Sequence, residues 1–539
     1  MAEYRAVTTV LVMYHLLECE VTGRAPLGPL SRHRVVVTTQ GSVRGYFAPR
    51  PPHYSYLGLP YARPPTHYDR FKAPEPPPRW SGIFEAIHRV KCPQPDGSGD
   101  ENCLVVNVFT PEDAETAPVI VHIHDGGFQS GWGTFTAPTR FLEQGFVFIS
   151  LNYRIGALGF LSLGIEDVPG NAGIKDQVAA LYWIHRNVEK FGGDSSDITV
   201  YGTGSGAVSI EIILMSGLTE NLFQKVILES GSILSPSSLT RDPVLLAFDF
   251  AKSTGYKGDS NPQPLREYYY DVPVKILTNT SRIFRPCIER TVAEYHNLLE
   301  RDPRDVLREG KYQHVPLMIV YTQAEEVDII LHDPETFQSI IDNMEDLLPA
   351  NLIFDSSEVK DKIIKLIKKF YFDDIDTASG ITHSLADYIN DVFLEYPVAK
   401  SVTYYANRNT YPVYLMKFAD LHTRLKDHRY VGTNKYNDIL RYITSDRLED
   451  SEDLQAQKLV MLWTNFINVG DPTPLTSPLL PVIWQPVQVH EIHGQIAVQK
   501  IPCLQFDETF TNILLSGKHL KFWDSIYDKF YRTTTEKCN

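Results

Sequence analysis

The chain has 539 residues, of which 43% are hydrophobic and 22% are charged, and this composition excludes wholesale disorder. It holds 51 Lys and Arg against 66 Asp and Glu, so its formal net charge at pH 7 is −15. Because nucleic acids are polyanions, this acidic balance disfavours a nucleic-acid partner. No apolar run reaches the roughly 18 residues of an ordinary membrane-spanning helix. We therefore expect a globular protein with a large core.

The N-terminal 23 residues are predicted to be a signal peptide. Arg5 precedes a mostly apolar stretch over residues 6–17, and the small residues up to Gly23 suit cleavage after that position. The alternative is a buried strand or helix of the domain itself. Because patterning typical of a fold starts only near Arg34, we favour cleavage and a secreted, extracellular protein.

Strand-like and helix-like segments alternate over the first 60% of the chain. Short, continuous apolar runs are typical of strands that are buried on both faces of a sheet. They predict strands at 118–124, 146–152, 198–201, 225–229, 315–321 and 411–418. Apolar residues that recur every three or four positions predict helices at 174–188, 357–370, 384–407, 453–468 and 516–530. This alternation favours an α/β fold with a doubly wound sheet.

Cysteines and one sequon add to the extracellular interpretation. Cys92 and Cys103 flank a turn-rich polar stretch that readily brings its two ends together, so we expect a disulfide between them. Cys538 is the penultimate residue, and we expect it either to link two chains or to be a free thiol. Asn279 begins an Asn-Thr-Ser sequon, which predicts a glycoprotein.

A strand, a tight turn and a helix are predicted around residue 204. An α/β-hydrolase places its nucleophile at the centre of a G-x-S-x-G turn. Gly202 and Gly206 keep this spacing, but the central residue is Gly204, which has no side chain to attack a carbonyl. Ser205 follows directly, but a shift of one residue along a sharp turn would point its side chain elsewhere. The nucleophile position is therefore predicted to be empty.

The chain resembles the type-B carboxylesterases, the cholinesterase-like branch of the α/β-hydrolases, from about residue 34 to about residue 530. The matching blocks are Tyr56–Pro65, Arg70–Pro74, Glu101–Pro111, Asn152–Leu161, Gly170–Gln177 and Phe191–Asp194. The resemblance implies an α/β-hydrolase fold, with a large, mostly parallel central sheet flanked by helices. It also implies a single carboxylesterase-like domain over residues 24–539.

The resemblance further implies a catalytic triad, whose positions in this chain are degenerate. The nucleophile position falls on Gly204, the acid on Glu325, and the base on Tyr436 or Lys435. His428 is a less favoured, displaced base. Without an imidazole that titrates near neutral pH, the general-base activation of a serine is lost. We therefore interpret the chain as a catalytically inactive pseudoenzyme.

The oxyanion hole is predicted to be vestigial. The resemblance places its backbone donors at Gly126, Gly127 and Ser205, while the glycine expected before them is replaced by Asp125. A carboxylate at that place would oppose a developing negative charge. The alternative is that Asp125 caps a turn.

Two classes of function are compatible with such a site, together with a residual activity. The catalytically inactive members of the family, such as neuroligins, neurotactin, gliotactin and glutactin, imply extracellular protein recognition or cell adhesion, with a protein partner of unknown identity. The alternative is a secreted binder of a small hydrophobic ligand in the emptied pocket, near Phe128 and Trp132. A second alternative is a residual carboxylic ester hydrolase that uses Ser205.

A homodimer is predicted through the C-terminal helices, because family members form a dimer interface there. The apolar anchors would be Leu459, Leu462, Phe466, Leu520, Trp523 and Ile526. The alternative is that these side chains pack within the chain. No cofactor or metal is expected, since His122 and His124 alternate on one strand without a third ligand at the spacing of a metal site.

Overall fold

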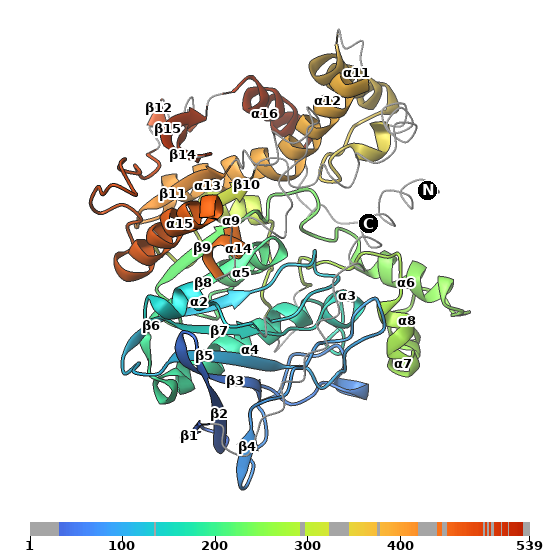
Figure 1. Ribbon diagram of the computed structural model, residues 1–539. Helices are drawn as coiled ribbons and strands as arrows, with labels where there is room; N and C mark the ends of the chain where they lie inside the picture. Colours follow the sequence, from blue (N-terminus) through green and yellow to red (C-terminus); the bar gives the residue numbers. More distant parts are fainter. Residues whose placement is uncertain are drawn as a thin grey trace.

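Figure 1 shows the computed structural model of the chain. The structure describes residues 32–133, 136–290, 297–322, 344–373, 378–418, 439–444, 450–488, 491–492, 495–496, 501–507, 509–515 and 517–531. The predicted signal peptide and Cys538 lie outside these residues. Within the described part of the chain, no helix is both long and apolar enough to cross a membrane.

A single large sheet forms the centre of the molecule. In the described residues it has 13 strands, in the order β1-β2-β3-β5-β7-β6-β8-β9-β10-β11-β14-β15, with β4 paired to β2. These are β1 (His33–Val37), β2 (Ser42–Pro49), β3 (Pro52–Pro60), β4 (Ile83–Glu85), β5 (Val105–Pro111), β6 (Ala117–Ile123), β7 (Val147–Leu151), β8 (Gly193–Thr203), β9 (Lys225–Glu229), β10 (Leu317–Thr322), β11 (Val413–Phe418), β14 (Ile501–Phe506) and β15 (Phe510–Leu515). From β7 to β14 every neighbouring pair is parallel. The predicted fold class, with its large and mostly parallel central sheet, is confirmed.

Helices cover both faces of this sheet (Figure 1). They are α2 (Thr139–Glu143), α3 (Gly156–Phe160), α4 (Ala172–Asn187), α5 (Ser205–Ser216), α6 (Pro243–Ser253), α7 (Pro262–Asp271), α8 (Val274–Thr278), α9 (Pro303–Glu309), α11 (Ser357–Phe372), α12 (Ala378–Asn390), α13 (Tyr396–Arg408), α14 (Ile439–Thr444), α15 (Asp450–Val469) and α16 (Lys518–Phe530). A small second sheet pairs β12 (Glu491–Ile492) with β13 (Gln495–Ile496).

The alternation of side chains along each strand divides the core between the two faces. On β6, Val119 and Val121 belong to the cluster that includes α4 and α5, whereas Ile120 belongs to the cluster that includes α15. On β10, Ile319 and Met318 divide in the same way. Successive strand residues point to opposite faces, and both faces are covered here. For this reason the central strands read in the sequence as continuous apolar runs.

Most predicted elements differ from the structure by up to three residues at an end, and two differ by more. The strand predicted at 198–201 begins five residues earlier, at Gly193. The helix predicted over 384–407 is divided, because a π-helical segment over Asp391–Glu395 separates α12 from α13. Such a segment shifts the hydrogen-bond pattern locally without interrupting the apolar periodicity, so the sequence gives no sign of it.

The apolar side chains predicted to anchor a dimer pack within the chain instead. Five of the six have an exposed fraction of 0–1%, and Leu520 is half-buried against the core. The residues on α15 fill the space between that helix and the sheet, and those on α16 pack against α11 and α12. The assignment of these side chains to an interface is therefore wrong, while the homodimer itself remains a prediction.

Candidate active site

The turn between β8 and α5 has the geometry of a nucleophile elbow. Gly204 separates the strand from the helix with φ 50° and ψ −114°, a conformation that residues with a side chain rarely adopt. A Cβ at Gly206 would collide with the carbonyl of Ile123 at the end of β6, and one at Gly202 would collide with the backbone of Gly206. The glycine spacing thus lets the helix start directly against two strand ends.

Asp125 fills the space above the elbow. It follows the end of β6, which is the parallel neighbour of β8, so the carboxyl ends of these two strands lie side by side. The three atoms nearest to a Cβ built on Gly204 are the Cγ, Oδ1 and Oδ2 atoms of Asp125, all at distances that no real Cβ could tolerate. The carboxylate therefore occupies the place where the side chain of a nucleophile at position 204 would begin.

Backbone donors hold this carboxylate in position. Asp125 Oδ1 accepts a hydrogen bond from the Ser205 N–H at 2.7 Å and another from the Gly127 N–H at 3.2 Å. Ser205 is also the first residue of α5, whose N-terminal dipole favours a negative charge. Two of the predicted oxyanion-hole donors are thus directed at a carboxylate of the chain itself, which caps both the helix and the turn.

Ser205 points into the same site. Its hydroxyl donates to Asp125 Oδ1 at 2.9 Å, and the residue is 6% exposed. The expectation that a one-residue shift would turn this side chain away from the elbow is wrong, since the first turn of α5 directs it back toward the end of β6. Tyr153 lies beside it: burial raises the pKa of the Tyr153 hydroxyl, and a hydrogen bond with Ser205 opposes that rise.

The two histidines at the end of β6 are buried and uncharged. Burial lowers the pKa of His122 to about 3 and that of His124 to about 4. His124 Nδ1 lies 2.7 Å from the carbonyl oxygen of Asp125, and its ring stacks on Tyr153 with 4.3 Å between ring centroids. With such low pKa values, neither imidazole is a strong proton acceptor at neutral pH. They pack the floor of the site.

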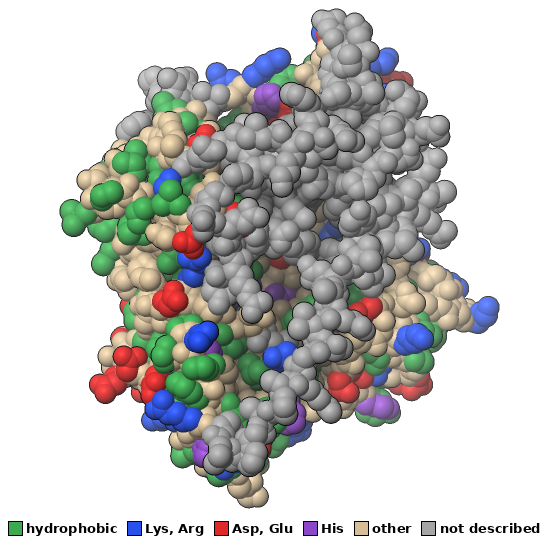
Figure 2. Space-filling view, viewed as in Figure 1, with side chains coloured by type: hydrophobic (Ala, Val, Ile, Leu, Met, Phe, Trp, Pro, Cys, Tyr) green, Lys and Arg blue, Asp and Glu red, His purple; other side chains and the backbone are tan. Residues whose placement is uncertain are grey.

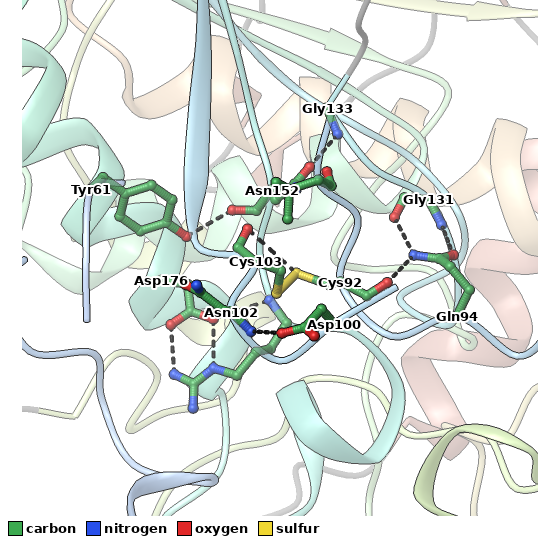
Figure 3. Close-up of a disulfide and its surroundings, with 12 residues drawn as sticks. Tyr61, Cys92, Gln94, Asp100, Asn102, Cys103, Gly131, Gly133, Asn152 and Asp176 are labelled. Atoms are coloured by element: carbon green, nitrogen blue, oxygen red, sulfur yellow. Dashed lines mark hydrogen bonds and ion pairs between the residues drawn. A yellow bond between two sulfur atoms is a disulfide. The ribbon is translucent and has the colours of Figure 1, made fainter. Parts of the chain in front are cut away.

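The predicted disulfide between Cys92 and Cys103 is present, and it is tied to the loop that carries the oxyanion-hole turn (Figure 3). Gln94, two residues after Cys92, donates from Nε2 to the carbonyl of Gly131 at 2.9 Å. In return, the Gly131 N–H donates to Gln94 Oε1 at 3.0 Å. The side chain of Asn152 accepts from the Gly133 N–H at 2.7 Å in the same region. These contacts fix the segment that follows Asp125.

A buried ion pair supports the other side of this region. Arg154 binds Asp176 of α4 through two nitrogens, with Nε–Oδ2 at 2.7 Å and Nη2–Oδ1 at 2.5 Å. The exposed fractions of the two side chains are 3% and 0%. The third guanidinium nitrogen, Nη1, donates to the carbonyl of Arg70 at 3.0 Å. Three of the family blocks found in the sequence therefore meet at one interior contact.

The predicted acid and base positions of the triad fall outside the described residues. These are Glu325 for the acid, and Tyr436, Lys435 or the displaced His428 for the base. Among the described residues, no group of three or more His, Cys, Asp or Glu side chains could hold a metal ion.

The aromatic residues predicted to line an emptied pocket have other contacts. Phe128 is 2% exposed and packs edge-on against Phe160, with 4.9 Å between ring centroids. Trp132 is 37% exposed, and the Lys91 ammonium lies 3.5 Å from the centre of its ring.

The position of Asp125 is the feature that sequence reasoning missed. Two substitutions that look unrelated in the sequence, a carboxylate gained at 125 and a side chain lost at 204, concern the same space in the structure. The complementary sizes of the two residues could have indicated their contact. A larger side chain follows the end of one strand, at Asp125, and a side chain is missing after the neighbouring strand, at Gly204.

Comparison with known proteins now assigns the chain. Residues 32–512 match the family model described as the carboxylesterase family, so the chain belongs to that family. It is 30% identical over 477 residues to Esterase FE4 of Myzus persicae, covering 80% of this chain and 83% of that protein. It is 28% identical over 513 residues to the juvenile hormone esterase of Tribolium castaneum, covering 85% and 86%.

A solved structure agrees with the fold. The juvenile hormone esterase from Manduca sexta, with OTFP covalently attached, superimposes with a TM-score of 0.78 at 24% identity. The alignment covers 92% of this chain and all of that one. The α/β-hydrolase fold is therefore confirmed.

These comparisons overturn the interpretation of the chain as a pseudoenzyme. The relatives just described are named as esterases, and the resemblance to the inactive adhesion members finds no support among them. The physical reason for the error lies at the elbow. The prediction of an empty nucleophile position considers Gly204 alone, whereas a serine hydroxyl and a carboxylate meet directly above it.

Proposed function

We propose that the chain hydrolyses carboxylic esters at this elbow, with Ser205 as the nucleophile and Asp125 as its proton acceptor. The observation that carries the proposal is the 2.9 Å hydrogen bond from Ser205 Oγ to Asp125 Oδ1. A nucleophile and its base need to lie within hydrogen-bonding distance, about 2.6–3.2 Å. Membership of the carboxylesterase family supports esters as the class of substrate.

The hydrogen bonds of Asp125 suggest how the reaction proceeds. Ser205 Oγ attacks the ester carbonyl carbon while its proton moves to the Asp125 carboxylate. A neutral carboxyl group attracts N–H donors less than a carboxylate does. The Ser205 and Gly127 N–H groups are then released from Asp125 and can bind the new oxyanion of the tetrahedral intermediate. Proton transfer and stabilisation of the oxyanion are thereby coupled.

The same chemistry sets the expected rate. An ordinary aspartate has a pKa of about 3.9 and an ordinary histidine about 6.5. The best general base has a pKa near the working pH. Because a carboxylate is the weaker acceptor, we expect ester turnover to be slower than with an imidazole base.

A fluorophosphonate probe, which phosphonylates activated serines, tests the proposal. We expect one label per chain in the wild type, no label in Ser205→Ala, and loss of at least about 99% of the labelling rate in Asp125→Asn, since a general base contributes about 100-fold or more.

Ser216→Ala is the matched control for this experiment, because Ser216 is at the opposite end of the same helix, where its hydroxyl donates to the carbonyl of Ile213 and accepts from the Leu218 N–H. This variant should label like the wild type. Labelling that persists in Ser205→Ala, or an unlabelled wild type, would contradict the proposal.

An extracellular location is part of the proposal. It is supported by the Cys92–Cys103 disulfide, since disulfides persist in oxidising compartments. Asn279 is exposed, as an attached glycan requires. The predicted protein partner, the homodimer, the adhesion role and the binding of a small hydrophobic ligand remain predictions.

A further inference from the structure

We propose that the outer face of α11 and α16 binds a lipid bilayer whose surface carries negative charge. We call this face the lysine surface, and its cationic side chains are Lys362, Lys365, Lys368, Lys369, Lys518 and Lys521. The proposal does not depend on ester hydrolysis at the elbow. It follows from the clustering of positive charge, from the apolar side chains between the lysines and from the type of the cationic residues.

The lysines of α11 gather on one side of the helix, although the whole chain has a formal net charge of −15. Lys362, Lys365 and Lys369 are spaced by three and four residues, so they project from the same side, and all three are exposed. The two acidic residues of α11, Glu358 and Asp361, precede them in the first two turns. Figure 2 shows Lys and Arg side chains at this end of the molecule.

The neighbouring helix α16 adds two lysines to this face. The Lys518 Nζ atom lies 4.7 Å from the centre of the Phe370 ring of α11. Phe370 in turn stacks on Phe522 of α16, with 4.0 Å between the ring centroids. Lys521 is exposed and follows Lys518 by three residues, so both ammonium groups lie on the same side of α16. The two helices therefore present one continuous basic face.

The positive charge of this face is not neutralised by the described part of the chain. Lys360, the remaining lysine of α11, pairs with Glu345. The two acidic residues of α16 pair with Lys400 and Arg304 on other helices. None of the six lysines of the surface forms an ion pair with another described residue. Their charge is available to an anionic partner.

Apolar side chains lie half-exposed among the lysines. Leu366 is 44% exposed, and Phe370 and Phe372 are only partly buried. Of the apolar and aromatic residues of α11, only Ile367 and Tyr371 are fully buried. A helix that lies in the interface of a bilayer has this character, because its apolar side chains enter the acyl-chain boundary. The long lysine side chains then extend their ammonium groups toward the lipid headgroups.

These features favour a bilayer over two other occupants. A second copy of the chain, docked through the same face, would place lysines against lysines, and like charges oppose that contact. A sulfated polymer in solution would neutralise the ammonium groups but leave the apolar side chains in water. All six cationic side chains are lysines rather than arginines, which bind single phosphate or sulfate groups through two parallel hydrogen bonds. The surface therefore suits a broad layer of negative charge.

Co-sedimentation of the full chain with lipid vesicles tests the proposal. One set of vesicles consists of phosphatidylcholine, and the other of equal amounts of phosphatidylcholine and phosphatidylserine. We expect binding to the mixed vesicles to be at least about 100-fold tighter, and salt to weaken it. The triple variant Lys365→Glu, Lys369→Glu and Lys518→Glu should bind them at least about 100-fold more weakly, since each lysine near an anionic surface contributes a factor of about five.

The matched control reverses three exposed lysines on other parts of the chain, with Lys190→Glu, Lys257→Glu and Lys275→Glu. It changes the net charge by the same amount and should bind the mixed vesicles at least ten times more tightly than the first triple variant, by the same factor per lysine of about five. Equal melting temperatures of both variants and the wild type would show that the fold is kept. Equal binding by the two triple variants, or a wild type that binds both kinds of vesicle alike, overturns the proposal.

Leu366→Asn separates a bilayer from an anionic polymer in solution. Loss of the apolar side chain should weaken binding to the mixed vesicles about three- to tenfold, while retention on heparin stays unchanged. Unchanged vesicle binding by this variant overturns the proposal, because the surface would then recognise charge alone. A wild-type dimer that dissociates in the first triple variant overturns it as well, since a second copy would then occupy the surface.

Discussion

Two aspartates in different regions of the molecule show how surroundings decide what a carboxylate does. Asp125, at the elbow, is partly exposed and is held by backbone N–H groups. Asp391, in the region formed by α11, α12 and α16, is buried and is held by the side chains of His519 and Tyr371.

The difference in their contacts separates the proposed proton acceptor from a structural group. Backbone donors position Asp125 without covering it, whereas the aromatic and imidazole rings around Asp391 enclose it. Asp391 links the π-helical segment between α12 and α13 to α16, and the Trp523 indole extends the network by donating to the Tyr371 hydroxyl at 2.7 Å. On the outer surface of this end, Figure 2 shows basic side chains and a histidine. Asp391 therefore has a structural role, because it connects the π-helical segment to α16.

The largest expected effect comes from refilling the elbow. Gly204→Ser alone places a side chain on the Asp125 carboxylate and on a backbone with φ 50°. Overpacking and strain together should lower the free energy of unfolding by about 2–5 kcal/mol. Gly204→Ser combined with Asp125→Gly frees that space and should recover at least half of the loss. Chemical denaturation of the two variants measures both values, and equal stability of the single and double variants would show that the two positions do not compete.

A somewhat smaller effect is expected at Glu211, a third carboxylate, which lies on α5 and is 1% exposed. It accepts from the Ile233 N–H at 2.5 Å and from the Tyr405 hydroxyl at 3.1 Å, and burial raises its pKa to about 7. Burial thus disfavours the ionised form of Glu211 in the folded protein. The contribution of the neutral carboxyl group to the free energy of unfolding is fully present below pH 4.5, the ordinary pKa of the group, and is lost as pH rises through about 7. The loss should amount to about 3 kcal/mol.

Glu211→Gln should remove this dependence, because the amide stays neutral. The variant and the wild type should have similar stability near pH 4.5 and diverge in favour of the variant by pH 8. Melting temperatures across this range measure the difference. Parallel curves for the two proteins would contradict the assigned pKa.

The smallest effect is expected at His519, whose side chain is 44% exposed. The hydrogen bond with Asp391 raises the pKa of His519 above its ordinary value of 6.5. Its contribution to stability is therefore fully present below pH 6.5 and is lost as pH rises through the folded pKa. Because the group is so exposed, we expect no more than about 1 kcal/mol. His519→Gln should be less stable than the wild type at pH 6 and match it at pH 9, with fluorophosphonate labelling unchanged at both.

Sequence reasoning recovered the parts of the molecule that have a local signature. The apolar runs of β6, β7 and β9 and the glycines around position 204 could be recognised because burial and backbone geometry dictate them residue by residue. The N-terminal strands β1–β4, which pair as a mostly antiparallel edge, were not predicted. Burial alternates along β1 and β2, but the residue types do not follow it, since Val35 and Val37 are exposed while Gly45 is buried.

What could not be predicted depends on contacts between distant parts of the chain. Asp125 and Ser205 are 80 positions apart, and only the parallel pairing of β6 with β8 brings them together. The apolar periodicity over α15 correctly predicted a helix. However, an amphipathic pattern does not show whether the apolar face packs against the same chain or against another one. The inactivity inferred from Gly204 failed for the same reason, because one position was judged without its neighbour.

The two hydrogen bonds between Gln94 and Gly131 connect the small loop closed by the Cys92–Cys103 disulfide to the loop that follows β6. Reduction of that bridge would release the segment on which Gln94 sits, and with it the support of the strand-end loop that carries Asp125 and Gly127. The proposed ester hydrolysis at the elbow would then depend on the redox state of the surroundings. In a thiol-rich compartment, the protein would lose this activity before it unfolds.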